Sequence, residues 1–150
     1  MTTGADGLRV DVQRLDPEMP LPAYAHPGDA GIDLHARESI VIRSGGGRVL
    51  MPTGIAIAIP LGWAGFVLPR SGLALKHGLS VVNSPGLIDS AYRGELKVVL
   101  INTDPTDDYE VTRGDRIAQL VLERVGEVTW NEVDDLSGDD RGGGFGHSGR

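Results

Sequence analysis

The sequence predicts an all-β fold, and three observations support this prediction. Short runs of β-branched and other apolar residues recur along the chain, and Gly, Pro, Asn or Asp interrupts them about every 8 to 12 residues. Only one short segment has the pattern of a helix. The length of 150 residues fits a single domain with one core. Many short strands joined by tight turns are typical of a β-sandwich or β-barrel.

The expected strands follow one another from the N-terminus to the C-terminal region. They are residues 10–13, 40–42, 49–51, 55–59, 65–68, 81–82, 96–101, 117–122 and 125–133. The glycine-rich run 44–47 predicts a hairpin loop between the second and third of these strands. Pro60 and Pro69 are stop signals for the strands that precede them.

The one helical candidate is the segment from Ser71 to His77. Ser71 can cap its N-terminus, and Gly78 can end it after a turn or two. A helix this short leaves the prediction of an all-β protein unchanged.

Composition limits the function classes. The formal net charge of −7 argues against broad binding to nucleic acid or to an anionic membrane. A phosphate ligand would need a local cluster of donors or an accompanying metal cation. The absence of cysteine excludes disulfides, thiolate chemistry and a Cys-based zinc site. No apolar run is long enough to cross a membrane and the first residues do not resemble a signal peptide, so we expect a cytoplasmic protein.

The chain is expected to divide into two parts. Residues 1–136 form the β-barrel domain, with residues 1–7 disordered. Residues 137–150 form a flexible, Gly-rich segment with almost no core-forming side chains. Phe145, surrounded by glycines, is unusual for a mere linker.

Five segments combine glycine with polar or charged residues. In the first, 28–34, Asp33 is a candidate to hold a metal ion through water, since Mg²⁺ favours carboxylates in this way. The alternative is a simple turn into a strand with Asp29 in solvent. In the second, 69–72, Arg70 offers a fork of donors for phosphate oxygens, and Ser71 opens a helix whose free N–H groups attract anions. The alternative is an ordinary capped helix beside a surface arginine.

The third segment, 83–97, has the pattern of a β-hairpin that can bind the edge of a planar base. Asn83 carries both a donor and an acceptor for this purpose. Asp89 is a candidate general base for a water molecule, and Tyr92 offers a flat ring against a sugar. The alternative places Tyr92 in the core and pairs Asp89 with Arg93.

The fourth segment, 113–120, predicts a turn followed by a strand from which Gln119 projects. Its Arg-Gly-Asp start suggests an adhesion motif, which fits an acidic cytoplasmic domain poorly, and Gln119 could instead be a satisfied polar residue in an interface. The fifth segment, 141–149, lets backbone N–H groups approach phosphates closely. Arg141 and Ser148 add donors, and Phe145 offers a face for stacking on a base. The alternative is a disordered tail.

In this order and spacing, the five segments resemble the five motifs of the trimeric dUTP pyrophosphatase (dUTPase) family, from about residue 20 to residue 149. The resemblance implies a jelly-roll-like β-barrel and a homotrimer with exchanged C-terminal segments. It also implies three active sites between subunits. The implied reaction is hydrolysis of dUTP to dUMP and pyrophosphate, which keeps uracil out of DNA and supplies dUMP for thymidylate synthesis.

The resemblance also assigns roles to residues. Asp89 would activate the water that attacks the α-phosphorus. Asp33 would hold the water shell of Mg²⁺, which the triphosphate itself mainly binds. The phosphate chain would contact Arg70, Ser71, Gly72 and Gln119. The uracil and deoxyribose would contact Asn83, Leu87, Ile88, Asp89 and Tyr92, with Lys97 a further contact or else a solvated lysine at a strand edge. The tail would close over the ligand through Arg141, Phe145, Gly146 and Ser148.

One position departs from the family pattern: His147 stands where the first of two adjacent hydroxyl residues is usual. It either donates a hydrogen bond to the γ-phosphate or points away from it. Three other functions remain as alternatives: a related dCTP deaminase, a non-catalytic nucleotide sensor and a structural jelly-roll protein. The last would leave the arginine- and glycine-containing tail unexplained.

Overall fold

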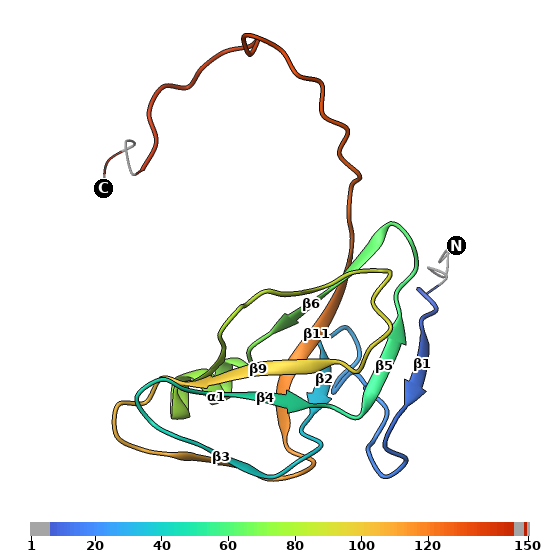
Figure 1. The fold of residues 1–150 in the computed structure, drawn as a ribbon, viewed down its shortest axis with the longest axis vertical. Coiled ribbons are helices and arrows are strands. Elements are labelled where there is room, and N and C mark those ends of the chain that lie inside the picture. The colour runs from blue at the N-terminus through green and yellow to red at the C-terminus, as the bar shows by residue number, and fades with distance from the viewer. Residues whose placement is uncertain (1–6, 146–148, 150) are drawn as a thin grey trace.

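The computed structural model describes residues 7–145 and 149, and within them it confirms the all-β fold class (Figure 1). The strands and the helix are β1 (Asp11–Arg14), β2 (Ile32–His35), β3 (Ile40–Ile42), β4 (Gly47–Pro52), β5 (Ile55–Ala58), β6 (Trp63–Leu68), α1 (Ser71–His77), β7 (Leu79–Val81), β8 (Gly86–Ile88), β9 (Lys97–Asn102), β10 (Tyr109–Val111) and β11 (Arg116–Arg124). All strand pairs are antiparallel.

The strands form four small sheets around one core, as in a jelly-roll-like barrel. The largest sheet has the order β2-β11-β6-β8, and a second has the order β4-β9-β7. Two strand pairs, β1-β5 and β10-β3, close the sides. Fully buried side chains from different sheets meet between them, among them Leu34, Ile42, Met51, Leu100 and Val111. Removal of this apolar surface from water is the main favourable contribution to folding.

The predicted hairpin loop at residues 44–47 is wrong. β3 pairs with β10 and β4 pairs with β9, so the two strands on either side of this turn belong to different sheets. Gly45 and Gly46 have positive φ angles, and their N–H groups donate to the backbone oxygens of Asp104 and Asn102. The turn is therefore fixed to the loop after β9 instead of folding β3 back onto β4.

The predicted hairpin within residues 83–97 is also wrong. β8 pairs with β6 in the largest sheet, whereas β9 pairs with β4 and β7 in the second sheet. Segment 83–97 therefore crosses from one sheet to the other. As a result, it lies over the gap between the two sheets.

Two smaller predictions, one for the start of the helix and one for a strand after residue 124, are corrected as well. Ser71 is the first helical residue, and Arg70 occupies the N-cap position without a side-chain capping bond. Residues 125–133 form no strand, because β11 ends at Arg124 and no other strand of the described chain lies beside them. The segment leaves the barrel and extends away from it (Figure 1). Gly78, in contrast, ends the helix as predicted, in the left-handed conformation.

The buried side chain of Asn102 forms hydrogen bonds to the backbone of β3 and of the loop after β9. Its removal is therefore expected to destabilise the barrel. Its Nδ2 donates to the backbone oxygens of Ile42 (3.0 Å) and Asp107 (2.9 Å), and its Oδ1 accepts from the N–H of Asp104 (3.0 Å). Asn102→Ala leaves these groups without partners, and we expect it to lower the free energy of unfolding by about 2–4 kcal/mol. Denaturant unfolding at one fixed protein concentration measures this. A change of less than about 0.5 kcal/mol, as is usual for a surface position, would contradict it.

No helix in the described part of the chain is long and apolar enough to span a membrane.

Candidate active site

A basic pocket opens where β2, β11 and β6 lie side by side. Gln119 in β11 is the register partner of Asp33 in β2 and of Leu68 in β6. The chain that follows Leu68 then brings Arg70 to the same place. The resulting cleft has a volume of about 690 Å³. Its polar and charged lining residues are His26, Asp29, Asp33, Arg70, Ser71, Lys76, His77, Arg116 and Gln119, with Gly31 and Gly72 beside them.

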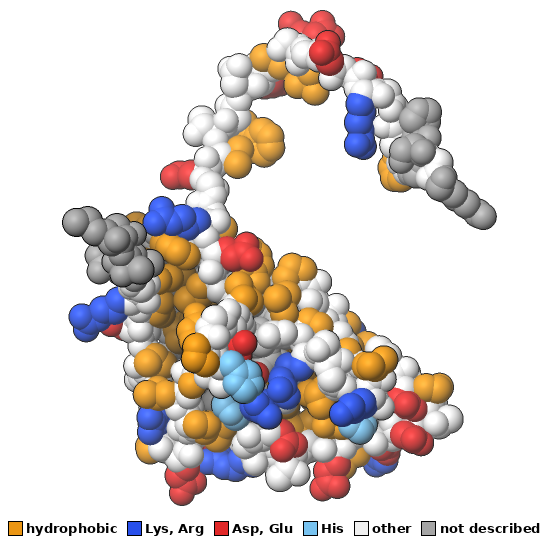
Figure 2. Space-filling model, turned by 180° about the vertical axis from the view of Figure 1, so that it is seen from behind, with side chains coloured by type: hydrophobic (Ala, Val, Ile, Leu, Met, Phe, Trp, Pro, Cys, Tyr) orange, Lys and Arg blue, Asp and Glu red, His pale blue; other side chains and the backbone are white. Residues whose placement is uncertain are grey.

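Ion pairs hold the centre of the basic pocket. Asp33 Oδ1 lies 3.3 Å from Arg70 Nε, and its Oδ2 lies 3.4 Å from Arg116 Nη1. Arg70 also donates to the backbone oxygen of Arg116, at 3.2 Å. The Asp33 side chain is 15% exposed and still lines the pocket. On the face shown in Figure 2, Lys, Arg and His side chains accordingly lie next to carboxylates.

Gln119 is fixed in this pocket by its neighbours on both sides. Its Nε2 donates to the backbone oxygen of Pro69, at 3.0 Å. On the other side it packs against Gly31, where an added Cβ would lie 2.2 Å from Gln119 Oε1. A side chain at position 31 would thus displace the amide. The Gln119 amide is thus held between Pro69 and Gly31 in the lining of the pocket.

Arg116 is a pocket residue that was not predicted from the sequence, because its position depends on a local irregularity in β11. The register shifts between Arg116, which pairs with His35, and Ala118, which pairs with Leu34. This bulge places Arg116 and Gln119, three residues apart, on one face of the strand. In a regular strand they would face opposite sides. His35 lies beside the same charges: burial, together with Arg116 and Arg70, lowers the pKa of His35, while Asp33 opposes the shift.

A second, apolar pocket of about 320 Å³ lies between the two main sheets. Strand residues that line it are Leu50, Val67, Val81, Val98 and Val99, and segment 83–97 adds Asn83, Gly86, Leu87, Ile88, Asp89, Tyr92 and Lys97, which we call its rim. All predicted residues of segment 83–97 therefore meet around one cavity. This is the consequence of the crossing from the largest sheet to the second sheet.

The alternatives for Tyr92 and Asp89 are wrong. Tyr92 is 43% exposed and so is not a core residue. Arg93 donates to the backbone oxygens of Ser90 and Tyr92, and Asp89 takes part in no ion pair among the described residues. The exposed Asp89 carboxylate is therefore accessible to a ligand or water at the mouth of the pocket.

The predicted site residues are divided among three places in one chain. The basic pocket and the apolar pocket share no lining residue. Arg141 and Phe145 are exposed and line neither pocket, and the C-terminal segment that carries them extends away from the barrel (Figure 1). Gly146, His147 and Ser148 lie outside the described residues. A single chain thus presents the pieces of the predicted site without joining them.

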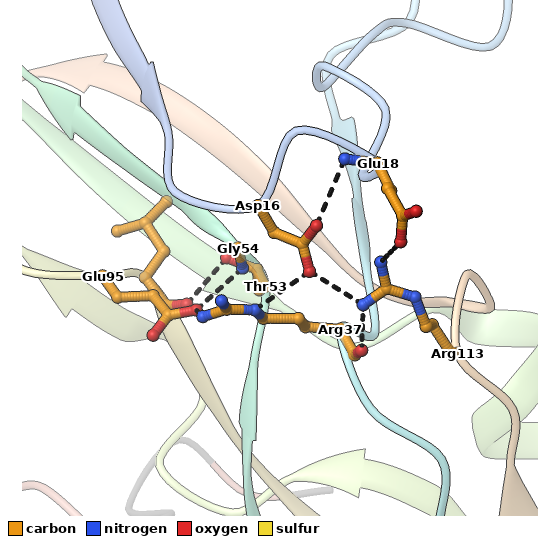
Figure 3. A network of polar contacts seen from close by, with 8 residues as sticks. Asp16, Glu18, Arg37, Thr53, Gly54, Glu95 and Arg113 are labelled. Carbon is orange, nitrogen blue, oxygen red and sulfur yellow. Dashed lines mark hydrogen bonds and ion pairs between the residues drawn. The ribbon is translucent and has the colours of Figure 1, made fainter.

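A network of ion pairs joins Glu95, in segment 83–97, to side chains from three other parts of the chain (Figure 3). Asp16 Oδ2 lies 3.1 Å from Arg37 Nε and 2.8 Å from Arg113 Nη1. Arg37 Nη1 also lies 3.1 Å from Glu95 Oε1. We refer to Asp16, Arg37, Glu95 and Arg113 as the ion-pair network. It connects the loop after β1, the loop after β2, the residue two before β9 and the turn before β11.

The ion-pair network makes stability depend on pH in the acid range. The hydrogen bond from Arg113 is the main reason why the pKa of Asp16 lies far below its ordinary value; burial opposes it, and bonds from the Glu18 N–H and from Arg37 add to it. A carboxyl group with a lowered pKa stabilises the fold above its ordinary pKa of about 3.9, and this contribution is lost as the pH falls below that value toward the lowered pKa. We expect Asp16→Asn to lower the melting temperature near neutral pH.

The same substitution should also make the decline of the melting temperature between about pH 5 and pH 3 shallower than in the unmodified protein. Thermal unfolding across this range measures both effects. Asp11→Asn is the control, because the Asp11 side chain is 84% exposed and its one ion pair is 4.0 Å long. A decline as steep in Asp16→Asn as in the unmodified protein would contradict the prediction.

The fold and the two pockets define a class of protein: a small β-barrel that can hold a ligand with an apolar, ring-like end and an anionic end. The sequence model of the dUTPase family matches residues 17–149. The chain therefore belongs to the dUTPase family, and it is a hydrolase.

Curated relatives and solved structures agree with this assignment. The deoxyuridine 5'-triphosphate nucleotidohydrolase of Thermobifida fusca (strain YX) is 58% identical over 95% of this chain and 79% of the relative. The protein of the same name from Rhodococcus erythropolis is 53% identical over 97% of this chain and 88% of the relative.

Among solved structures, a substituted dUTPase of Staphylococcus bacteriophage 80alpha with dUpNHpp has a TM-score of 0.86 at 27% identity, over 94% of this chain and 98% of that chain. A dUTPase mutant of phage phi11 of S. aureus, described with a structural Mg(II) ion, has a TM-score of 0.81 at 23% identity. That match covers 87% of this chain and 100% of the phage chain, and it supports the shared fold.

Proposed function

We propose that this enzyme hydrolyses dUTP to dUMP and pyrophosphate at a site formed by the apolar pocket of one chain and the basic pocket of another. The observation that carries the proposal is the presence of both pockets in a member of the dUTPase family. One pocket suits an uncharged base and sugar, and the other suits a chain of phosphates. Removal of dUTP would keep uracil out of DNA, and the product dUMP would be available for thymidylate synthesis; the expected location is the cytoplasm.

The apolar pocket would bind uracil and deoxyribose. The Asn83 amide lies beside Gly86, where an added Cβ would be 3.4 Å from Nδ2. The amide and the backbone of residues 87–89 can together satisfy the donor and acceptors of uracil. Tyr92 would pack on the deoxyribose and leave no room for a 2′-hydroxyl group. Lys97, exposed at the rim, adds a positive charge toward the nucleotide.

The basic pocket would bind the triphosphate through Arg70, Ser71, Gly72 and Gln119. Arg70 presents a planar fork that fits phosphate oxygens, whereas Ser71 and Gly72 are exposed at the start of α1. Arg116 is an additional cation in the same cleft. These local donors offset the charge of the ligand despite the net charge of −7 of the whole chain.

The residues of the basic pocket fit Mg²⁺ that arrives with the triphosphate. The described residues contain no group of three or more His, Asp or Glu side chains that could cage an ion. Asp33 and Asp29 do line the pocket, and one or two carboxylates together with phosphates and waters are the usual surroundings of Mg²⁺. Asp33 would hold the metal's water shell, and the bound ion would neutralise charge on the phosphates.

Asp89 would be the general base. Its exposed carboxylate at the mouth of the apolar pocket would orient a water molecule and accept its proton. The water oxygen would form a bond to the α-phosphorus while the bond to the bridging oxygen of pyrophosphate breaks. Positioning and electrostatic stabilisation account for most of the catalysis in phosphoryl transfer.

The proposed assembly is a homotrimer with exchanged C-terminal segments. Residues 126–145 are exposed throughout, and Trp130 and Leu136 expose 89% and 93% of their surface. Apolar side chains this exposed on an extended segment are unfavourable in water and are expected to pack on a neighbouring chain. Residues 1–136 would form the barrel domain, and the Gly-rich segment 137–150 would close over the nucleotide. Sedimentation equilibrium should give a mass of three chains, and a monomer would contradict the assembly.

The test is an assay of pyrophosphate release from dUTP, dCTP, dTTP and UTP, with and without Mg²⁺. It measures the type of reaction, the specificity for base and sugar, and the dependence on the metal in one experiment. We expect rapid release from dUTP with Mg²⁺ and far slower release from the other three nucleotides. Ammonia release from dCTP would instead identify a deaminase. Binding of dUTP without any release of pyrophosphate would identify a non-catalytic sensor.

A further inference from the structure

The position of the Tyr92 ring is determined by two neighbours in its own segment. The Tyr92 hydroxyl donates to the backbone oxygen of Glu95, at 2.8 Å. The ring lies directly against Gly94, where an added Cβ would be 2.6 Å from the hydroxyl oxygen. The rim of the apolar pocket therefore depends on where the backbone of Gly94 and Glu95 is held.

The Glu95 side chain holds this backbone to the barrel. Its Oε1 accepts from the N–H of Gly54 (2.9 Å) and from Arg37 Nη1 (3.1 Å), and it is only 15% exposed. The next residue, Leu96, is held at the same corner, because its backbone oxygen accepts from the Thr53 hydroxyl, at 2.7 Å. The close-up in Figure 3 shows Glu95, Thr53, Gly54 and Arg37 gathered there.

The Arg37 side chain also pairs with Asp16, so that Glu95 on one side and Asp16 on the other hold its guanidinium group. Gly54 is restricted from the same side: it has a φ of +76°, and an added Cβ would lie 3.1 Å from Asp16 Cβ. None of Asp16, Arg37, Glu95 and Arg113 lines the apolar pocket. Their charged groups can affect a ligand there only through the residues that they hold, and Tyr92 is connected to Glu95 by a hydrogen bond.

We infer that Glu95 and Arg37 are positioning residues for sugar discrimination: they hold the Tyr92 ring at the place where it excludes a ribonucleotide. The inference rests on the proposed function, in which Tyr92 packs on the deoxyribose. The two nucleotides differ by one hydroxyl group, so the Tyr92 ring excludes UTP by occupying a space of about the size of one atom. A small displacement is therefore enough to reduce the discrimination.

The measurement is the ratio of kcat/KM for dUTP to kcat/KM for UTP. We expect Tyr92→Phe, which removes the hydroxyl, and Glu95→Ala, which removes the support, each to lower this ratio about tenfold, mainly through better use of UTP. The double variant Tyr92→Phe/Glu95→Ala should lower it no further than either single variant, because both act on one ring. Glu95→Gln keeps an acceptor oxygen for Gly54 and Arg37 and should restore most of the ratio.

Arg113→Gln is the control for the part of the ion-pair network outside the support: it breaks the ion pairs to Asp16 and Glu18 and the hydrogen bond to the Arg37 backbone oxygen, but leaves the pair between the Arg37 and Glu95 side chains in place. It should lower the melting temperature and leave the ratio unchanged. If Glu95→Ala does not fold, Arg37→Met tests the same support from the other side and should lower the ratio about threefold.

Three results would overturn the inference. The first is that Glu95→Ala reduces kcat/KM equally for both nucleotides. The second is that Arg113→Gln lowers the dUTP-to-UTP ratio as much as Glu95→Ala does. The third is that the double variant lowers this ratio by the product of the two single effects. The proposed function fails separately. If the unmodified protein does not hydrolyse dUTP, the activity is wrong, and if it hydrolyses dUTP and UTP equally, the role of Tyr92 and the inference fail together.

Discussion

Asp89→Asn is expected to lower kcat for dUTP about 10³-fold, within the range of 10²–10⁴ that is typical for the loss of a general base. The amide keeps the size and most of the polarity of the carboxylate, but it cannot accept the proton of the attacking water. The side chain is exposed and forms no ion pair among the described residues, so its replacement should leave the fold intact. Single-turnover pyrophosphate release and a separate binding measurement with dUTP distinguish lost chemistry from lost binding.

Asp107→Asn is the control for this substitution. Asp107 is an exposed carboxylate in the loop after β9, where its side chain accepts from the Thr106 hydroxyl, at 3.2 Å. It lines neither pocket, so we expect unchanged turnover. If Asp89→Asn turned over dUTP as fast as this control, Asp89 would not be the base.

Removal of residues 141–150 is expected to lower kcat/KM for dUTP about 10²-fold, the size of effect that follows when a substrate is no longer held in the reactive geometry. The segment carries Arg141 for the γ-phosphate and Phe145 for stacking on uracil. The barrel should remain folded and assembled, because all core side chains lie at or before Leu120. Steady-state kinetics, with circular dichroism and sedimentation of the truncated protein, measure both parts of the prediction.

Removal of Arg150 alone is the control for the truncation, since the fifth motif ends at Gly149. It should leave kcat/KM unchanged. If the protein without residues 141–150 remained as active as the full chain, closure of this segment would not contribute to the reaction. If it no longer assembled, the segment would be structural and the kinetic result would have to be assigned to lost assembly.

Most strands could be predicted because alternating apolar residues and turn residues act locally. The region 55–59 and the stop at Pro69 are examples, since both depend on neighbours in sequence. The pairing of strands depends on distant residues and was therefore predicted less well. The turn at 44–47 has the composition of a hairpin loop, but its amides bond to the loop after β9, and no local pattern contains that information.

In the candidate site, too, some residues could be predicted from the sequence, and others could not because their positions depend on distant parts of the chain. Asp33 and Gln119, far apart in sequence, are indeed register partners, and the predicted residues of segment 83–97 surround one pocket. Arg116 was missed because a bulge changes which face of β11 it occupies. The ion-pair network was missed because its members come from four separate parts of the chain, each ordinary on its own. The roles of the individual site residues remain predictions until the kinetics are measured.

The separation of the two pockets has a consequence for mixtures of defective chains. If each working site takes its apolar pocket from one chain and its basic pocket from another, a chain defective only at Asp89 and a chain defective only at Arg70 carry complementary defects. Unfolded together and refolded as mixed oligomers, they would form some sites from two intact halves. Two preparations that are each inactive would then recover part of the activity on mixing, and the recovered fraction would report how the chains are arranged around each site.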